Sequence, residues 1–417
     1  MKKIIHKFTT FFNKYFFPFY KTKDIKLLFR NLEEGIKKDK EVAMFVGGCV
    51  RNHLQSKKVD DIDIATIFTP NELKEKLQNT KFKIIETGLE HGSVTIVAKN
   101  KKYELTTLRK DIKTDGRHAE IETINDWKED SKRRDFTINA IYLNKKGKIY
   151  DPQQGVKDLN NNVVKFIGDP QTRIEEDFLR IIRFLRFSIQ YNSSVEISDA
   201  RAIKLNLNGI KNLSKERVLS ELLKILKLKN FYKIIENNEL LEVFSLIYPE
   251  LENTHRLKNF NVLNNHIESS EILLLCILLI NTKSNHEYFS HKYNVSNKIK
   301  ENLSLISSKF NDLKKDKDFF KKNLKKNLYK IGLKNLKILY SLHLLDKKKI
   351  ALQDVGFFKV LEKEIIPTFP YDGKFLIKKG IKEGKKIGIV LNEAEQIWIK
   401  NNFFLSLEDM EIIIKKS

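Results

Sequence analysis

A glycine turn followed by two aspartates is the feature that most restricts the fold of this chain. Residues 42–46 form a short apolar run that ends in Gly47–Arg51 (GGCVR), and Asp61 and Asp63 follow further on. The apolar run predicts a buried strand that enters a tight turn. Side chains alternate along a strand, so Asp61 and Asp63 are expected on one face of the next strand. The turn can bind phosphate and the carboxylates can bind divalent metal, so the segment predicts phosphoryl or nucleotidyl transfer.

The composition fits a protein of several domains that binds a polyanion. The chain has 417 residues, and its 78 basic and 54 acidic residues give a formal net charge of +24. A surplus of this size favours nucleic acid as the partner. Part of the charge has an alternative origin in drift under an A/T-rich genome, because lysine, asparagine and isoleucine are abundant throughout.

The same composition argues against a membrane-spanning or secreted protein. The longest strongly apolar run, residues 272–280, is too short to span a bilayer. Residues 1–20 mix lysine with phenylalanine and have no continuous apolar core or cleavage site, so we interpret residues 1–22 as an amphipathic leader segment. The two cysteines exclude a disulfide scaffold and predict a reducing, cytoplasmic location.

Arginine is rare in this lysine-rich chain, which makes its positions informative. Only 13 of the 78 basic residues are arginine, and none follows Arg256. Arginine kept against a lysine background indicates a need for its planar, bidentate guanidinium, as in phosphate and base recognition. Nine of these residues are Arg51, Arg109, Arg117, Arg133, Arg134, Arg173, Arg180, Arg183 and Arg186.

The pattern of apolar residues changes once along the chain. Residues 22–150 alternate short strands and helices, whereas the pattern from about residue 156 onward is helical almost to the end. This order predicts an α+β multidomain protein, with a mixed sheet and helices first and an all-α remainder. The predicted strands are residues 43–46, 61–65, 82–87, 93–98, 102–107 and 140–143.

A second polar constellation is Lys132–Ala140 (KRRDFTINA). Asp135 and Asn139 are four residues apart, which places them on one helical face, where they could bind a ribose hydroxyl. Arg134 would then reach phosphate. The alternative is an ordinary polar pair on the surface.

A third constellation is Glu176–Arg186 (EDFLRIIRFLR). Asp177 and Arg180 are three residues apart and are expected to point into one groove, and Arg183 and Arg186 continue the same stripe. Arginines repeated in this way would repel one another without an anion. The alternative for Asp177 and Arg180 is a surface ion pair that contributes little stability.

These segments resemble the ordered motifs of the tRNA nucleotidyltransferase and bacterial poly(A) polymerase family, and the class II tRNA nucleotidyltransferases in particular. The glycine turn with its aspartates is similar to motif A, and Asn52 stands where the family usually has aspartate. The other segments resemble motifs B, C, D and E, and they are Lys132–Ala140, Asp151–Leu159, Glu176–Arg186 and Leu213–Leu222.

The resemblance implies a polymerase-β-like head that adds C, C and A to the 3′ end of tRNA from CTP and ATP. It implies that Asp61 and Asp63 hold two Mg²⁺ ions. It further implies that Gly48, Arg51 and Arg134 position phosphate, whereas Asp177 and Arg180 bind the edge of the incoming base. Glu104 on a later strand is the candidate for a third carboxylate, and an outward-facing strand glutamate is the alternative.

The resemblance also divides the chain. Gly373 to Gly388 and Trp398 resemble the C-terminal part of bacterial members, which implies tRNA binding through phosphate contacts. The predicted divisions are a leader segment (1–22), a catalytic head (23–155), a nucleotide-selecting neck (156–228), a body (229–310) and a tRNA-binding tail (311–417).

Related activities remain as alternatives. A poly(A) polymerase would carry an arginine-rich signature between motifs A and B, which this sequence lacks. CC-adding relatives lack a flexible head loop, whereas residues 111–122 resemble that loop intact. A-adding relatives keep the loop and are not separated by it. A non-catalytic tRNA-binding protein is the alternative from another class, although it would not need to keep Asp61, Asp63 and Glu104.

Overall fold

The computed structural model describes residues 18–37, 40–89, 92–99, 101–114, 119–263 and 266–416. The chain forms two compact units, of which one ends at Pro249 and the other begins at Glu250. Most of the predicted leader segment lies outside the described residues, and so do residues 115–118 at the centre of the predicted head loop. The boundary between the units falls inside the predicted body, and the finer divisions at residues 155, 228 and 310 stay predictions.

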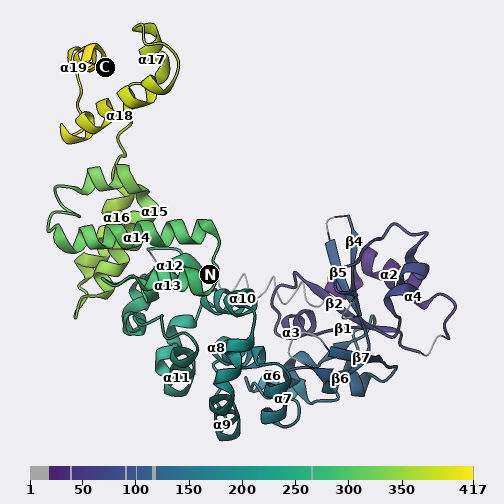
Figure 1. Ribbon diagram of the computed structural model, residues 1–417. Coiled ribbons are helices and arrows are strands. Elements are labelled where there is room, and N and C mark those ends of the chain that lie inside the picture. Colours follow the sequence, from purple (N-terminus) through teal and green to yellow (C-terminus); the bar gives the residue numbers. More distant parts are fainter. Residues whose placement is uncertain are drawn as a thin grey trace. The chain divides into compact units, whose positions relative to one another are not determined.

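A mixed sheet forms the centre of the first unit. Its described strands follow the order β3-β4-β5-β2-β1-β8-β9. β4, β5, β2 and β1 are labelled in Figure 1. β2 and β5 are parallel neighbours, and the remaining neighbours are antiparallel. The strands are β1 (Ala43–Val46), β2 (Ile62–Thr66), β3 (Lys83–Ile85), β4 (Ser93–Ala98), β5 (Lys101–Thr107), β8 (Tyr142–Leu143) and β9 (Ile149–Tyr150).

Helices α2 (Lys23–Glu33), α3 (Gly48–Leu54) and α4 (Pro70–Leu77) belong to this sheet region. α2 buries Ile25, Leu28, Phe29 and Leu32, which recur at helical spacing, and it packs against α4 (Figure 1). α4 begins with a capping box between Thr69 and Glu72. α3 contacts β1 and β2, so the helix that follows the glycine turn is fixed against both central strands.

A separate hairpin follows the sheet in sequence. β6 (Arg109–Thr114) pairs with β7 (Ala119–Thr123), and their register shifts between Asp111 and Lys113. The predicted head loop 111–122 is therefore largely strand outside residues 115–118.

The rest of the first unit is helical. Its α-helices are α5 (Trp127–Lys132), α6 (Gly155–Asn160), α7 (Pro170–Glu176), α8 (Leu179–Tyr191), α9 (Ile197–Asn206), α10 (Lys215–Leu226) and α11 (Asn238–Ile247). The 3-10 turns of this unit are η1 (Phe19–Lys21), η3 (Thr137–Asn139), η4 (Leu207–Asn212) and η5 (Phe231–Glu236). Ser214 caps α10 by accepting the Arg217 backbone N–H.

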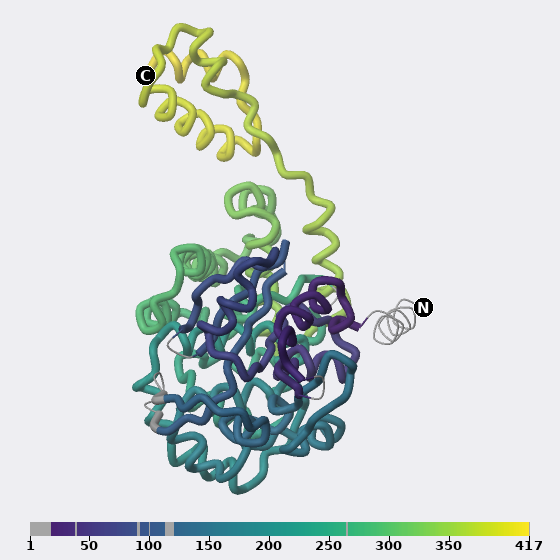
Figure 2. The backbone as a smooth tube through the Cα atoms, turned by 90° about the vertical axis from the view of Figure 1, so that its right-hand side faces the viewer, coloured from purple at the N-terminus to yellow at the C-terminus, as the bar shows by residue number. Residues whose placement is uncertain are grey.

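The second unit is helical throughout its described residues. Its core includes α12, in which Leu273–Leu279 are all buried. α17, α18 and α19 share a cluster that includes Leu376, Val390, Trp398 and Met410 (yellow in Figure 2). The elements are η6 (Thr254–Leu263), α12 (Glu271–Leu279), α13 (Asn285–Lys292), α14 (Asn297–Lys315), α15 (Leu324–Leu345), α16 (Leu352–Lys363), α17 (Gly373–Lys378), α18 (Lys385–Lys400) and α19 (Leu407–Lys416).

The predicted α+β architecture is confirmed. The strands predicted at 43–46 and 93–98 have the predicted bounds. The strand predicted at 140–143 starts only at Tyr142, because the Ala140 N–H is bound by the Thr137 carbonyl in a 3-10 turn. Among the described residues, every helix is too short or too polar to cross a bilayer.

Candidate active site

Two carboxylates face one another at the centre of the sheet, and a third lies at the entry to β2. Asp63 of β2 and Glu104 of β5 are direct partners in the parallel register, so their side chains share one face. Asp61 immediately precedes β2. Burial raises the pKa of Asp63 to about 6, with further contributions from the charges of Glu104 and Asp61, and Arg134 and Arg51 oppose the shift. The ionised form of Asp63 is therefore disfavoured by burial and by the neighbouring negative charges, and a bound cation would offset both.

The glycine turn approaches Asp63 closely. Gly47 has φ +73°, and a Cβ at this position would lie 3.6 Å from Asp63 Oδ2. The Cys49 thiol donates to the carbonyls of Val46 (3.2 Å) and Asp63 (3.5 Å), which ties the turn to β2. Burial raises the pKa of this thiol to about 12, so Cys49 has a structural role in the turn.

A pocket of about 700 Å³ opens beside these carboxylates. Asp63 and Glu104 contribute its acidic groups, and Arg109, Arg133 and Arg134 contribute cations. The remaining lining residues are Val46, Ile64, Thr87, Gly88, Ser93, Thr95 and Thr106. Carboxylates for metal and guanidiniums for phosphate thus occur in one pocket, as a nucleoside triphosphate with its metal ions requires.

The fully buried Asp130 organises the arginines of this pocket. It accepts hydrogen bonds from Arg133 Nε (2.7 Å), Arg134 Nη2 (3.1 Å) and the Tyr142 hydroxyl (2.6 Å). Although burial opposes ionisation, Arg134 and Arg133 hold the pKa of Asp130 well below its usual range. Asp130 was not among the residues predicted from the sequence, although its spacing of three and four residues before the two arginines is a usable signal.

Asp135 and Asn139 link α3, which follows the glycine turn, to α8 through a chain of hydrogen bonds. Arg51 of α3 donates to Asn139 Oδ1, and Asn139 Nδ2 donates to Asp135 Oδ1 (2.9 Å). Arg183 of α8 donates to Asp135 Oδ2 from Nε (2.8 Å) and Nη2 (2.5 Å). The helical face predicted for Asp135 and Asn139 is wrong, because Asp135 precedes the 3-10 turn η3.

Arg51 lies outside the lining of this pocket. Its guanidinium lies 4.8 Å from the centre of the Phe187 ring of α8, and the residue is 8% exposed. In this structure Arg51 therefore connects α3 with η3 and α8.

The arginines of α8 have internal carboxylate partners. Arg180 Nη1 donates to Glu176 (2.5 Å) and to the Arg173 carbonyl (2.7 Å), and its Nη2 donates to the Arg133 carbonyl (3.2 Å). Arg183 pairs with Asp135. Arg186 pairs with Glu221 of α10 at 2.7 Å. The expectation that these arginines need an external anion is wrong, because the fold supplies three carboxylates.

Asp177 does not pair with the Arg180 side chain. Its Oδ2 instead accepts from Arg217 Nη2 of α10 at 2.8 Å, and its Oδ1 accepts from the Leu179 N–H at 3.1 Å. The sequence pattern gave no signal for this pair, because Asp177 and Arg217 are 40 positions apart.

The carboxylates fit a hard divalent cation. Oxygen donors suit Mg²⁺ or Mn²⁺, and the crowding of charges at Asp63 favours a cation there. Within the described ranges, no three acidic, histidine or cysteine side chains converge on one point. Asp61 and Asp63 would therefore supply part of the coordination and leave the rest to water and phosphate.

Comparisons with known proteins agree with these features. Residues 43–165 match the model of the poly A polymerase head domain. Residues 194–254 match the model described as a probable RNA and SrmB-binding site of polymerase A.

Full-length relatives were also found. CCA tRNA nucleotidyltransferase 1, mitochondrial, of Danio rerio is 31% identical over 95% of this chain and 93% of its own length. A CCA-adding enzyme of Lactobacillus helveticus is 30% identical over 88% of this chain and 92% of its own length. The structure of the Bacillus stearothermophilus CCA-adding enzyme in complex with CTP has a TM-score of 0.67 at 21% identity, and the match covers 93% of this chain and 95% of that one.

Proposed function

This chain belongs to the family of CCA tRNA nucleotidyltransferases, and we infer that it adds C, C and A to the 3′ end of tRNA. Its substrates are tRNA, CTP and ATP. Each addition forms one phosphodiester bond and releases pyrophosphate. The observation that carries this conclusion in the structure is the pocket that contains both Asp63 with Glu104 and the three arginines.

We propose that Asp61 and Asp63 hold the divalent metal, and that this metal is Mg²⁺. A metal held there would lower the pKa of the attacking 3′-hydroxyl and offset negative charge on the triphosphate. Glu104 lies beside Asp63 on the neighbouring strand. From there it can act as a general base for the 3′-hydroxyl of tRNA or as a further metal ligand.

The arginine-lined part of the pocket is the proposed binding site for the triphosphate. Arg134 is held by Asp130 and Tyr142 and keeps a fixed orientation toward a triphosphate. Arg109 and Arg133 line the same pocket and are added to the predicted set. Gly48 begins α3, and we propose that its backbone N–H binds phosphate at the start of this helix. We propose that Arg51 contributes indirectly, through Asn139 and Asp135.

Base selection is assigned to Asp177 and Arg180. A carboxylate accepts a hydrogen bond from the exocyclic amine of cytosine or adenine, and a guanidinium donates to a ring nitrogen or carbonyl oxygen. Arg183 and Arg186, with their partners Asp135 and Glu221, orient the helix that carries Arg180.

The division of labour along the chain is also a proposal. We assign catalysis to the head (23–155), base selection to the neck (156–228) and tRNA binding to the tail (311–417). We propose a cytoplasmic location, because both cysteines are buried free thiols. Fractionation of cells that express a tagged chain tests the location, and recovery in an organelle would contradict it.

The activity is tested with a tRNA that ends before CCA. CTP alone should extend it by two residues, CTP with ATP by three, and ATP alone by none. Failure to add C would contradict CCA addition. An A-adding enzyme would extend only a tRNA that already ends in CC, and a poly(A) polymerase would add long tracts from ATP alone. A non-catalytic tRNA-binding protein would extend none of these substrates.

A further inference from the structure

The carboxylate of Asp177 is held at two points. Asp177 lies in the break between α7 and α8, with extended backbone angles (φ −156°, ψ 103°). One oxygen accepts the Leu179 N–H at 3.1 Å, and the other accepts Arg217 Nη2 at 2.8 Å. Two anchors on different oxygens fix the plane of a carboxylate and leave further lone pairs for a ligand.

Arg217 comes from a different helix than the other groups around the base-selecting residues. It lies in the first turn of α10, and the N-cap residue Ser214 accepts its backbone N–H. The Asp177 side chain is 23% exposed and that of Arg217 is 31% exposed. The pair is therefore accessible to a ligand but is more enclosed than a typical surface ion pair.

Arg180, the neighbouring guanidinium, forms its hydrogen bonds with groups other than Asp177. Arg180 donates to Glu176 and to the Arg173 and Arg133 carbonyls. These bonds hold Arg180 independently of Asp177. Arg217 is thus the guanidinium that the fold directs at Asp177.

We propose that Arg217 is a positioning residue for base selection, which acts by holding the Asp177 carboxylate in the plane that accepts an exocyclic amine. This inference rests on the proposed role of Asp177. Cytosine and adenine present an amine at the edge concerned, whereas uracil presents a carbonyl oxygen that cannot donate. A carboxylate that loses one anchor can rotate, so the amine loses part of its advantage over the carbonyl.

The test uses the full chain with four variants and a tRNA that ends before CCA. The variants are Arg217→Gln, Arg217→Lys, Asp177→Asn and the double variant Asp177→Asn/Arg217→Gln. Exposed Arg201 of α9 provides the matched control Arg201→Gln. The measurements are kcat and KM for CTP, the misincorporation of UTP, and the melting temperature.

Arg217→Gln should lower kcat/KM for CTP by about 10- to 100-fold, the usual weight of a hydrogen bond to a charged group. UTP incorporation should change little, so the CTP-to-UTP ratio should fall by a similar factor. Arg217→Lys should give an intermediate ratio, because lysine keeps the charge without the planar guanidinium. The double variant should be no worse than Asp177→Asn alone, since Arg217 acts through Asp177.

Three results would overturn the proposal: an unchanged CTP-to-UTP ratio, an equal loss with both nucleotides, or additive effects in the double variant. If Arg217→Gln fails to fold, Arg217→Lys decides, because an unchanged ratio in that variant contradicts the inference. Failure of the wild-type chain to add C would instead contradict the function itself.

Discussion

At the scale of single residues, the candidate active site contains two carboxylates whose surroundings shift their pKa values in opposite directions. Burial raises the pKa of Asp63, and the negative charges of Glu104 and Asp61 raise it further. Asp130 has the opposite environment, because two arginines and a tyrosine hydroxyl stabilise its charge. A bound cation would therefore stabilise the charge of Asp63, whereas the charge of Asp130 is already stabilised by Arg133 and Arg134.

Asp63→Asn should stabilise the metal-free protein above pH 6. The folded protein binds more protons than the unfolded chain between the ordinary aspartate pKa of 3.8 and the raised value of about 6. The stability of the wild type therefore falls as pH rises through this window, and the ionised form costs about 3 kcal/mol. Asparagine removes that cost, which urea unfolding at pH 7.5 would measure.

The control for Asp63→Asn is Asp60→Asn, since Asp60 is exposed and pairs with Lys58. It should leave the free energy of unfolding nearly unchanged. Saturating Mg²⁺ should narrow the difference between Asp63→Asn and the wild type, because the cation relieves the same repulsion. A wild type that is more stable than Asp63→Asn without metal would contradict the assignment.

Asp61→Ala should abolish nucleotide addition and leave tRNA affinity nearly intact, because its carboxylate is assigned to metal and not to RNA. Single-turnover extension and a tRNA binding assay measure the two effects. Removal of divalent metal by a chelator should reproduce the loss of activity in the wild type. Turnover that is unchanged in Asp61→Ala would refute the metal assignment.

Asp130→Asn should destabilise the first unit by about 3 kcal/mol, because it leaves two partly buried guanidiniums without their common, fully buried carboxylate. KM for CTP and ATP should rise together, since Arg133 and Arg134 lose their orientation. The partly exposed Glu129, which pairs with Lys132, gives the control Glu129→Gln, with an expected effect below about 1 kcal/mol. Equal stability of the Asp130→Asn and Glu129→Gln variants would show that Asp130 does not organise the pocket.

At the scale of elements, α6 packs against η3 at the point where the chain leaves the sheet. Gly155 at the start of α6 packs so tightly that a Cβ would lie 2.0 Å from the Thr137 carbonyl oxygen. Asp151 accepts the backbone N–H groups of Gly155 (2.8 Å) and Val156 (2.9 Å), and Asp158 accepts from the Thr137 hydroxyl (2.6 Å). The segment that resembles motif C is therefore a packed contact with the segment that resembles motif B.

Gly155→Ala should lower stability by about 2 kcal/mol, because the methyl group must displace backbone. Gly356 of α16 is the matched control, since a Cβ there meets no atom within 4 Å. Gly356→Ala should stabilise the chain by about 0.5–1 kcal/mol through a higher helix propensity. Thermal unfolding followed by circular dichroism distinguishes the two, and shifts in the same direction would contradict the packing argument.

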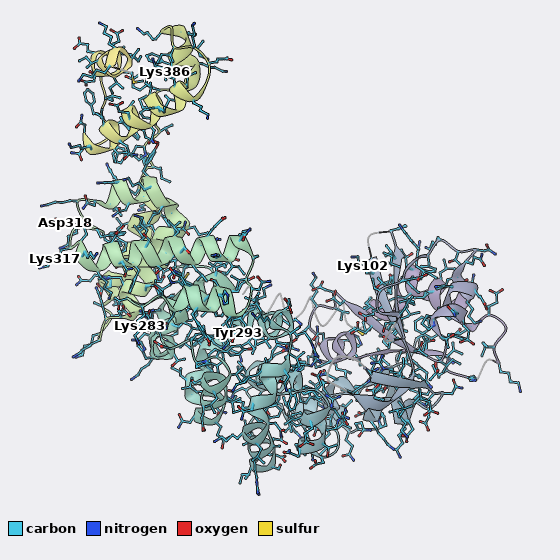
Figure 3. The ribbon with its side chains drawn as sticks, viewed as in Figure 1. Lys102, Lys283, Tyr293, Lys317, Asp318 and Lys386 are labelled. Atoms are coloured by element: carbon cyan, nitrogen blue, oxygen red, sulfur yellow. The ribbon has the colours of Figure 1, made fainter. Side chains whose placement is uncertain are left out.

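At the scale of the whole molecule, the surplus of positive charge indicates which kind of partner the protein binds. The net charge is +24, and lysines such as Lys283, Lys317 and Lys386 are exposed on the second unit (Figure 3). Such a distribution favours a long polyanion over a single nucleotide. CTP and ATP, by contrast, are expected in the pocket of the first unit.

KM for tRNA should therefore rise at least about tenfold between 50 and 200 mM salt, because several phosphate contacts release counterions. KM for CTP, measured at saturating tRNA, should change much less. Steady-state kinetics across this salt range measure both values. Equal salt dependence for the two substrates would contradict tRNA binding through backbone phosphates.

The sequence by itself determined the local features. The glycine turn, β1 and the positions of Asp61 and Asp63 follow from short-range rules on apolar runs, turns and alternation, and the change from a mixed sheet to helices follows from periodicity. It did not find the strands of the β6–β7 hairpin, whose few apolar residues give little periodic signal.

Only the tertiary structure decided which charges meet. A spacing of three residues shows that Arg180, Arg183 and Arg186 share a face, but it does not identify their partners. Arg180 finds Glu176 within its own segment, whereas the Arg183–Asp135 and Arg217–Asp177 pairs join residues that are 48 and 40 positions apart. Such pairs depend on how elements pack, because opposite charges buried together must be matched across elements that no local pattern links.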